Sequence, residues 1–328
     1  MKKISILIPC YNEENNIAPM AEALTKIMMD YSGKYDYEII FRDNASIDKS
    51  LDVMRSLAEV DKHIKVIANA RNYGTETKKD SFAGRVSGDV VIYIACDFQE
   101  PPELIPYYIS YWERGFEAVC GQRTSSKEVW FRYGLRQFFY NIIDVFSDTP
   151  QYRNLSGICL LSRRLYELYH EYNDKTLRYF LADIGCNVKL IQYEQQKRRS
   201  GKSSYNIWRY LSFAVYALTS VSTAPLRLAS VLGFCMSFLS FLIGLVYLIY
   251  KLIYWDSFVV GTAPMVIGIF FLGSVILFFI GVVGEYVGIT LRTVTKQSPP
   301  IVKELINFDN ADKDPYLFET KVRCEDKS

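Results

Sequence analysis

Two charge-free apolar runs near the C-terminus constrain this chain more than any other feature of its 328 residues. They comprise Leu228–Tyr250 and Thr262–Gly284, and neither contains Asp, Glu, Lys or Arg. A bilayer core about 30 Å thick needs about 20 helical residues at a rise of about 1.5 Å each, and both runs reach that length. Buried helices of a soluble protein are the alternative, but such helices are seldom apolar on every side over this distance. The sequence therefore predicts two transmembrane helices.

Basic residues beside the runs predict their orientation. The stretch between the runs holds only two charged residues, Lys251 and Asp256. Lysines and arginines gather before the first run and after the second: Lys197, Arg198, Arg199, Lys202, Arg209, Arg227, Arg292, Lys296 and Lys303. Segments rich in Lys and Arg stay on the cytoplasmic side of a membrane. We therefore expect a multi-pass protein of the inner (plasma) membrane, embedded in the lipid bilayer, with its large N-terminal domain and both termini in the cytoplasm.

The apolar runs divide the chain into four parts. A cytosolic α/β domain is expected over residues 1–204, two transmembrane helices within 228–290 and a cytosolic tail over 291–328. Residues 205–227 include Trp208 and Tyr210 among basic and small residues, which is typical of amphipathic juxtamembrane helices. An ordinary packing helix would share this composition.

Short apolar runs alternate with amphipathic stretches in the first part of the chain. The expected strands are Ile4–Ile8, Tyr37–Phe41, Ile64–Ala68, Val90–Ala95 and Ala118–Cys120, and the clearest helices between them are Ile17–Met29 and Leu51–Val60. Alternation of strands and helices predicts a mostly parallel sheet flanked by helices. Ligands of such sheets bind beyond the carboxyl ends of the strands.

Composition excludes several classes of function. The formal net charge of +2 argues against a general polyanion binder, so we expect no nucleic acid partner. The seven cysteines show no short paired spacing, which predicts reduced, buried thiols rather than a zinc site. Only His63 and His170 are present, and neither has a Cys or His partner nearby in the sequence, so histidine-centred catalysis is not expected.

Polar motifs follow the expected strands at the points where each ends. They are Pro9–Glu14, Asp43–Asp48, Arg71–Gly74 and Asp97–Glu103. The first two could simply begin helices, with Asn12, Asp43 and Ser46 as caps. Asp97 and Gln99 are harder to explain in that way. Two residues apart after an apolar strand, they offer hard oxygen ligands on one side, as Mg²⁺ or Mn²⁺ requires.

Taken in this order, the motifs resemble those of the inverting family-2 glycosyltransferases with a GT-A (Rossmann-like) fold, and within them the polyisoprenyl-phosphate glycosyltransferase branch. The resemblance extends to Gly121–Arg123, Arg198–Tyr205, Pro225–Leu228 and Gly281–Tyr286. It implies transfer of a sugar from a nucleotide-sugar, taken as a UDP-sugar, to a polyisoprenyl (undecaprenyl-type) phosphate at the cytoplasmic membrane face, with inversion, for cell-envelope glycans or lipids. It also implies a homo-oligomer, a tetramer in relatives.

The resemblance assigns roles to individual residues. Pro9, Tyr11, Glu13, Asp43 and Asn72 would bind the nucleotide part of the donor, Asp97 and Gln99 a Mg²⁺ or Mn²⁺ ion, Arg123 the lipid phosphate, and Arg198, Lys202 and Ser203 the donor phosphates. Among the remaining carboxylates, Asp183 is the candidate near the acceptor, although an acid on a helix surface would look the same. The expected catalytic set is therefore Asp97, Arg123, Asp183 and Arg198.

The chain departs from the family pattern in two places. Ala95 stands where relatives usually carry a second aspartate, so the metal would have fewer side-chain ligands. The segment that often reads Asp-x-Gly-Asp-Phe-Arg is here Asn154–Cys159, which removes an acid near the acceptor. A phosphate acceptor is already ionised near neutral pH, so the missing acid is tolerable.

Two other functions compete with lipid-phosphate glycosylation. A processive polysaccharide synthase should carry a Gln-x-x-Arg-Trp motif and more spans, whereas Gln195–Arg199 lacks the tryptophan. A non-enzymatic membrane scaffold would leave the acids and arginines at the strand ends without a purpose. Binding of a uridine nucleotide would separate the scaffold from the enzyme.

Overall fold

The computed structural model describes residues 1–74, 81–124, 152, 154–171, 177–196, 262–294, 300–309 and 314–317, with isolated positions between 231 and 253. The chain forms two compact units. One contains residues 1–134, 151–204 and 297–328, and the other contains 135–150 and 205–296.

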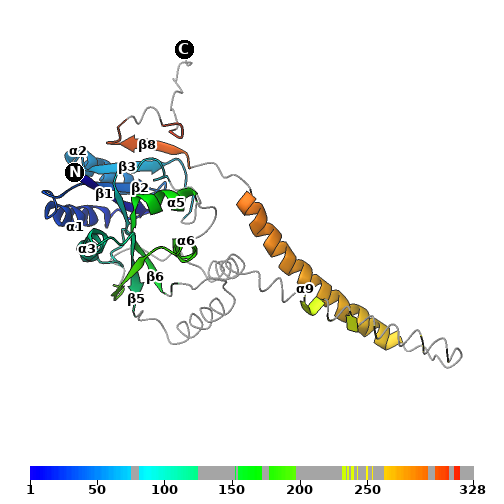
Figure 1. Cartoon of the computed structure of the whole chain (residues 1–328). Helices are drawn as coiled ribbons and strands as arrows, with labels where there is room; N and C mark the ends of the chain where they lie inside the picture. Colours follow the sequence, from blue (N-terminus) through cyan, green and yellow to red (C-terminus); the bar gives the residue numbers. More distant parts are fainter. Residues whose placement is uncertain are drawn as a thin grey trace, which may run out of the picture. The chain divides into compact units, whose positions relative to one another are not determined.

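An eight-stranded sheet forms the centre of the first unit (Figure 1), in the order β7-β5-β6-β4-β1-β2-β3-β8. Its strands are β1 (Lys2–Cys10), β2 (Tyr35–Asp43), β3 (Ile64–Asn69), β4 (Val90–Tyr93), β5 (Ala118–Arg123), β6 (Leu155–Ser162), β7 (Val188–Tyr193) and β8 (Val302–Ile306). Strands β1 to β4 are parallel neighbours, and β5 pairs in parallel with β7. Only β6 and β8 run antiparallel to their neighbours. The predicted mostly parallel sheet is therefore confirmed.

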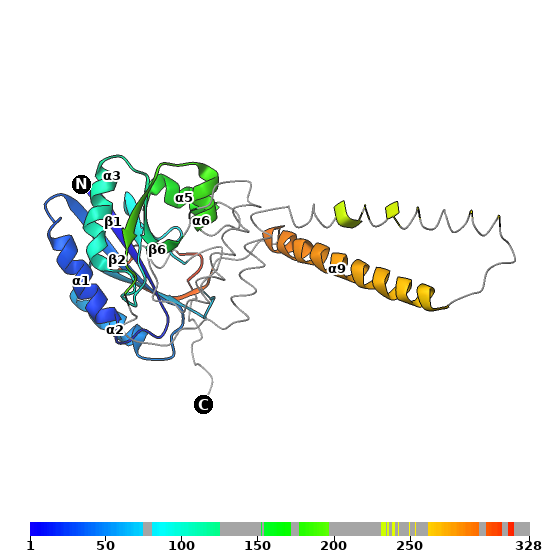
Figure 2. The same ribbon diagram turned by 90° about the horizontal axis from the view of Figure 1, so that it is seen from below.

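Helices cover both faces of this sheet. The described helices of the first unit are α1 (Ile17–Met29), α2 (Ser50–Val60), the 3-10 turn η1 (Pro102–Leu104), α3 (Ile105–Glu113), α5 (Arg163–Glu171) and α6 (Leu177–Ile184). Figure 2 shows α1, α2 and α3 on one face and α5 and α6 on the other. Ile4, Ile6 and Ile8 of β1 join the core under α1 to α3, whereas Leu7 joins the opposite core. A central parallel strand is buried on both sides, which explains why these runs are apolar throughout.

The sheet gains a strand that the sequence analysis places in the cytosolic tail. Strand β8 pairs antiparallel with β3 and covers its edge. Arg55 of α2 forms an ion pair with Glu304 of β8, with 2.6 Å between Nη2 and Oε2. Arg85 forms another with Asp314, with 2.6 Å between Nε and Oδ2. These contacts join the chain after residue 300 to the N-terminal sheet.

One pair of cysteines corrects the expectation of reduced thiols. Cys120 of β5 and Cys159 of β6 form a disulfide, with 4.2 Å between their Cα atoms. The antiparallel register places these two residues directly opposite each other. They are 39 residues apart in the sequence, so only the strand pairing reveals that they meet. Of the described cysteines, Cys10, Cys96, Cys186 and Cys235 are free thiols.

The described helices also correct the predicted localisation. Helix α9 of the second unit spans Thr262–Val294, so the second apolar run is helical, but the helix continues into a segment containing Glu285 and Arg292. The first apolar run is described only at isolated positions. Across the described part of the chain, none of the helices combines the length and apolar character that a membrane crossing requires. The predicted pair of transmembrane helices is not confirmed, and the predicted multi-pass inner-membrane localisation is contradicted by this finding.

A buried carboxylate stabilises the amino end of the sheet. Glu38 of β2 is 0% exposed and accepts hydrogen bonds from Ser5 of β1 and from the backbone and hydroxyl of Ser87. Lys65 of β3 forms an ion pair with Glu38, with 2.8 Å between its Nζ and the Glu38 Oε2. Burial alone would raise the pKa of Glu38, but the hydrogen bonds from Lys65, Ser5 and Ser87 prevail and lower it. The residue is therefore ionised in the folded protein at neutral pH and joins three strands.

We expect Glu38→Ala to lower the free energy of unfolding by about 3–5 kcal/mol, because it leaves Lys65, whose side chain is only 12% exposed, without this partner. The control is Asp36→Ala, which removes an exposed acid from the same strand and should change stability by less than about 1 kcal/mol. Urea unfolding of the full chain measures both. Because the pKa of Glu38 is lowered by folding, its contribution should be present above about pH 4.3 and disappear at lower pH. Equal stability of the two variants at pH 7 would contradict this role.

Candidate functional site

The candidate site lies at the carboxyl ends of the parallel strands, here called the strand-end edge. Strands β4, β1, β2 and β3 are neighbours with the same direction, so the loops that follow them emerge at one edge of the sheet. Strand β6 runs the opposite way and begins at this edge, where Leu155 faces Gln122 near the end of β5. All the strand-end motifs of the sequence analysis therefore meet along one line.

The loops after β1 and β2 are joined by hydrogen bonds between side chains and backbone. The backbone N–H of Asn12 donates to the Ser46 hydroxyl at 2.9 Å, and the N–H of Glu13 donates to the Ser50 hydroxyl at 2.8 Å. In return, the N–H of Ile47 donates to the Asn12 side chain at 2.9 Å. Asn12 therefore braces the neighbouring loop and does not cap α1, whose first turn follows Asn16. The simple capping interpretation does not hold for it.

Two buried acids and an exposed tyrosine belong to these loops. Glu13 is 9% exposed and accepts a hydrogen bond from the Asn16 amide. Asp43 is 2% exposed and accepts the backbone N–H of Ser46 at 3.1 Å. Tyr11 is 40% exposed, and Pro9 is also exposed. These loops therefore combine an exposed tyrosine with two buried, hydrogen-bonded carboxylates.

Asn44 connects the β2 loop to the β3 loop, and the sequence analysis did not identify it. Its amide nitrogen donates to the Asn72 side chain at 3.0 Å and to the Gly74 carbonyl at 3.1 Å. Its oxygen accepts from the Asn69 amide at 3.0 Å and from the Tyr73 backbone at 3.1 Å. With both its donor and acceptor groups used and only 7% of its surface exposed, Asn44 sets the shape of the Asn72 loop.

The turn after β4 holds the predicted metal ligands. Asp97 is 6% exposed and accepts the backbone N–H of Gln99 at 3.1 Å. Phe98, between them, has a φ of 57°, in the left-handed region. No group of three or more Asp, Glu, His or Cys residues is arranged for a metal among the described residues. An acid and an amide still suit Mg²⁺, which keeps several waters and takes oxygens from substrate phosphates.

Arg123 ends β5 on the same edge. Its guanidinium donates to the Gln195 side chain at 3.2 Å, and its backbone N–H donates to the Asn154 carbonyl at 3.0 Å. The N–H of Gln196 donates to the carbonyl of Gln99 at 3.1 Å. The segment after β7 therefore connects Arg123 to the turn that carries Asp97 and Gln99.

Glu100 is a further buried acid at this edge, and the sequence analysis gave it no role. Its side chain is among the buried polar groups, at 6% exposed. Burial raises the pKa of Glu100, while hydrogen bonds from the backbone of Ala95 and Ile158 and the charge of Arg123 oppose the rise. A glutamate in a proline-rich segment looks like a solvated surface residue in sequence, so no signal distinguished it.

Four non-glycine residues at the strand-end edge have left-handed backbone conformations. They are Asn12, Ala45, Phe98 and Asn154, with φ between 56° and 58°. This conformation costs an L-residue about 1–2 kcal/mol, and such outliers gather at functional sites. Their concentration in the loops after β1, β2 and β4 and before β6 separates this edge from the rest of the sheet.

The thiol of Cys10 is not set up as a nucleophile. Cys10 ends β1 and is 3% exposed. Burial raises the pKa of Cys10 well above its usual value, and the neighbouring Cys96 raises it further. The thiol is therefore protonated at neutral pH, and only a thiolate is a strong nucleophile.

The remaining predicted residues are Asp183 and the basic set Arg198, Lys202 and Ser203. Asp183 is on α6, five residues before β7, and β7 begins beside Ala118 at the opposite end of β5 from Arg123. The structure therefore does not bring Asp183 and Arg123 to the same end of the sheet. Arg198, Lys202 and Ser203 lie outside the described residues, as does the predicted juxtamembrane segment 205–227.

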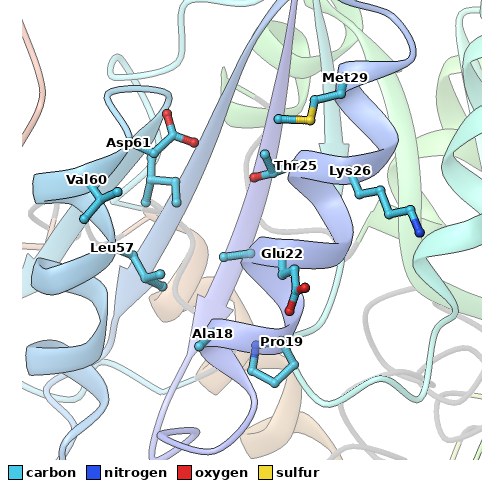
Figure 3. Close-up of a pocket in the computed structure, with 11 residues that line it drawn as sticks. Ala18, Pro19, Glu22, Thr25, Lys26, Met29, Leu57, Val60 and Asp61 are labelled. Carbon is cyan, nitrogen blue, oxygen red and sulfur yellow. The ribbon is translucent and has the colours of Figure 1, made fainter.

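A shallow hollow between α1 and α2 is separate from the strand-end edge (Figure 3). Its lining includes Glu22, Thr25 and Lys26 of α1 and Leu57 and Val60 of α2. Among the described residues, none of the predicted site residues lines it. The strand-end edge, with its buried acids and constrained loops, is the better candidate for chemistry.

Comparison with known proteins identifies the family of the chain. Residues 5–169 match the family described as glycosyl transferase family 2. The SfII prophage-derived bactoprenol glucosyl transferase of Shigella flexneri is 30% identical over 305 residues, covering 92% of this chain and 98% of the relative. The prophage bactoprenol glucosyl transferase homolog of Escherichia coli is 27% identical over 306 residues, covering 92% and 99%.

Solved structures give a weaker likeness. Glucosyl-3-phosphoglycerate synthase from Mycobacterium tuberculosis, crystallised with Mn²⁺, UDP and glucosyl-3-phosphoglycerate, is 16% identical with a TM-score of 0.43. The match covers 66% of this chain and 78% of that one.

The mostly parallel sheet, with helices on both faces and loops carrying acids at one edge, has the GT-A arrangement of glycosyltransferases. The family match contains β1 to β6 and the strand-end motifs that follow β1 to β4. The chain belongs to glycosyl transferase family 2 and is a glycosyltransferase. The resemblance stated from its motifs is confirmed at this level.

We expect Asn44→Ala to loosen the Asn72 loop, because four hydrogen bonds are lost at a buried position. The opening free energy of the loop should fall by about 1–3 kcal/mol. Amide hydrogen exchange measures this directly at Tyr73, whose backbone N–H donates to Asn44. Asn15→Ala, at an exposed position of the β1 loop, is the control and should leave exchange unchanged. Unchanged protection at Tyr73 in Asn44→Ala would contradict the bracing role.

Proposed function

We propose that this glycosyltransferase moves a sugar from a nucleotide-sugar, a UDP-sugar, to a polyisoprenyl phosphate of the undecaprenyl type, with inversion at the anomeric carbon. The observation that supports this best is the length of the match to the bactoprenol glucosyl transferases, which extends over 92% of this chain. The product would serve the modification of cell-envelope glycans or lipids.

The loops after β1 and β2 supply the donor side of the proposal. The exposed ring of Tyr11 can stack on a nucleobase, and the carboxylates of Glu13 and Asp43 can accept hydrogen bonds from the base or ribose. Asn72 would extend this surface along the loop that Asn44 holds. Fixed acceptors favour binding because no side-chain freedom is lost when the nucleotide arrives.

Asp97 and Gln99 would hold a Mg²⁺ or Mn²⁺ ion on the donor diphosphate. Such an ion supplies positive charge that stabilises the departing nucleoside diphosphate. Asp97 is already oriented by its hydrogen bond from the backbone of Gln99, so its position is set before any ligand binds. Ala95 leaves the turn with one acid fewer than relatives, which makes Asp97 the more important.

Arg123 would bind the acceptor phosphate. Its guanidinium carries a permanent charge and can contact two phosphate oxygens at once. The acceptor is an ionised phosphate monoester, so correct placement and charge stabilisation contribute more than proton removal by a strong base. The absence of an acid in the segment 154–159 is consistent with this chemistry. A single displacement through an oxocarbenium-like transition state would invert the anomeric centre.

Loss of the metal ligand should abolish transfer. We expect Asp97→Ala to lower turnover by at least about 10²–10³, the effect of removing a group that stabilises developing charge. Turnover is measured with radiolabelled UDP-sugars and polyprenyl phosphate, and it should require Mg²⁺ or Mn²⁺. Glu59→Gln, an exposed acid on α2, is the control. Full activity of Asp97→Ala in the presence of a chelator would refute the assignment.

A second variant tests the basic segment after β7. If Arg198 contacts the donor diphosphate through two guanidinium nitrogens, Arg198→Lys should already lower turnover, although the charge is unchanged. The neighbouring Arg199→Lys makes the same change in the same basic run and should retain activity. Assays in detergent micelles remove any bulk attraction to lipid surfaces. An unchanged rate and unchanged affinity for both substrates in Arg198→Lys would leave Arg123 as the main phosphate-binding residue.

A further inference from the structure

Glu100 lies where three separate parts of the chain meet at the strand-end edge. Its carboxylate accepts the backbone N–H of Ala95, after β4, at 3.4 Å. It also accepts hydrogen bonds from the backbone of Gly157 and Ile158, which belong to β6. The side chain is 6% exposed and interacts favourably with the charge of Arg123 at the end of β5. A single buried carboxylate thus connects the turn that carries Asp97 to the strand that begins beside Arg123.

Gly157 leaves room for the Glu100 carboxylate because it has no side chain. A Cβ atom at position 157 would lie 3.1 Å from one Glu100 oxygen and 3.5 Å from the other. The first distance is shorter than ordinary van der Waals contact, so a side chain there would press on the carboxylate. Glycine at this position allows the backbone N–H groups of β6 to reach Glu100.

The Asp97–Gln99 turn is also connected to the segment that follows β7. The carbonyl of Gln99 accepts the N–H of Gln196, and the side chain of the adjacent Gln195 accepts from Arg123. Phe98 has a left-handed backbone conformation, which costs energy and persists only when surrounding contacts maintain it. Glu100, whose side chain is 6% exposed, adds its own hydrogen bonds to these contacts.

We propose that Glu100 is a positioning residue, whose carboxylate fastens the Asp97–Gln99 turn to β6 and so fixes the metal-binding oxygens relative to Arg123. The inference rests on the proposed function, because it takes Asp97 and Gln99 as the ligands. Glu100 itself need not contact metal or substrate. It acts through the backbone of the turn, as groups behind a metal ligand do when they orient it.

The carboxylate is specifically suited to this role. It offers acceptors on both oxygens, and the backbone groups that surround it are N–H donors. A glutamine of the same shape would turn an amide NH₂ group toward one of these donors, so that two donors face each other. An aspartate is one methylene shorter and would lose contact with one of the two segments. Glu100→Gln therefore removes the positioning function with little change in volume.

Two variants of the full-length protein test the inference from opposite sides of the contact. Glu100→Gln replaces one carboxylate oxygen with an NH₂ group. Gly157→Ala places a methyl group against the carboxylate without altering any charge. Glu103→Gln is the matched control, because it changes an exposed acid of the same motif. Mn²⁺ affinity in the presence of UDP is measured by electron paramagnetic resonance, with kcat and KM for the UDP-sugar and circular dichroism to confirm folding.

We expect the dissociation constant for Mn²⁺ to rise roughly 10- to 100-fold in Glu100→Gln and in Gly157→Ala, the range found when a group behind a metal ligand is removed. Glu103→Gln should match the original protein. Excess Mn²⁺ should restore much of the turnover of Glu100→Gln, which a general loss of folding would not allow. If Glu100→Gln does not fold, the same rise in Gly157→Ala supports the inference.

A comparison with Asp97→Ala separates this inference from the proposed function. Loss of Mn²⁺ affinity in Asp97→Ala, with unchanged affinity in folded Gly157→Ala and Glu100→Gln, would overturn the positioning role alone. Unchanged affinity in Asp97→Ala would overturn the metal site and the positioning role together.

Discussion

Parallel pairing of β1 with both β2 and β4 is the constraint on which the rest of the first unit depends. A central strand paired on both sides has no free backbone groups, and its side chains are buried on both faces of the sheet. Polar side chains are therefore driven to the strand ends, where loops reach water. Because the strands share one direction, these ends coincide, and residues far apart in sequence form one surface. The acids, amides and arginine of the strand-end edge follow from this topology.

Several side chains of the strand-end edge form hydrogen bonds with the backbone of the surrounding loops. Asn12, Asn44 and Glu100 each use the side chain to fix the backbone of a neighbouring loop. Four strained residues occur among these loops, and the bracing bonds maintain them. These hydrogen bonds offset the free energy lost in the strained backbone conformations. They also leave Tyr11, Asp97 and Arg123 in defined positions. Such preorganisation is what a transferase needs when charge stabilisation, rather than proton transfer, carries the reaction.

Periodicity predicted the local elements well because burial on one helix face or on both sheet faces leaves a clear pattern. Ile17–Met29 is confirmed with the same bounds, and all five predicted strands exist, four of them longer than predicted and β4 two residues shorter. What the sequence could not show depends on pairing between distant segments. Strand β8 is short and contains Lys303 and Glu304, so its pattern is that of a surface loop until β3 is placed beside it. The Cys120–Cys159 disulfide and the contacts of Glu100 likewise exist only once β6 lies between β4 and β5. The two transmembrane helices were predicted from composition over a window, and the described helices do not confirm them.

The late position of β8 in the chain has a consequence for synthesis on the ribosome. Strand β3 is made early, yet its outer edge stays unpaired until residues 302–306 have emerged, after α9 and everything before it. An unpaired edge strand can pair wrongly with other chains, and the risk lasts as long as the edge is bare. The same event completes the Asn72 loop, since the N–H of Ile301 donates to the Tyr73 hydroxyl at 3.0 Å. A nascent chain that stops short of this point therefore lacks both the partner of the β3 edge and the hydrogen bond to Tyr73.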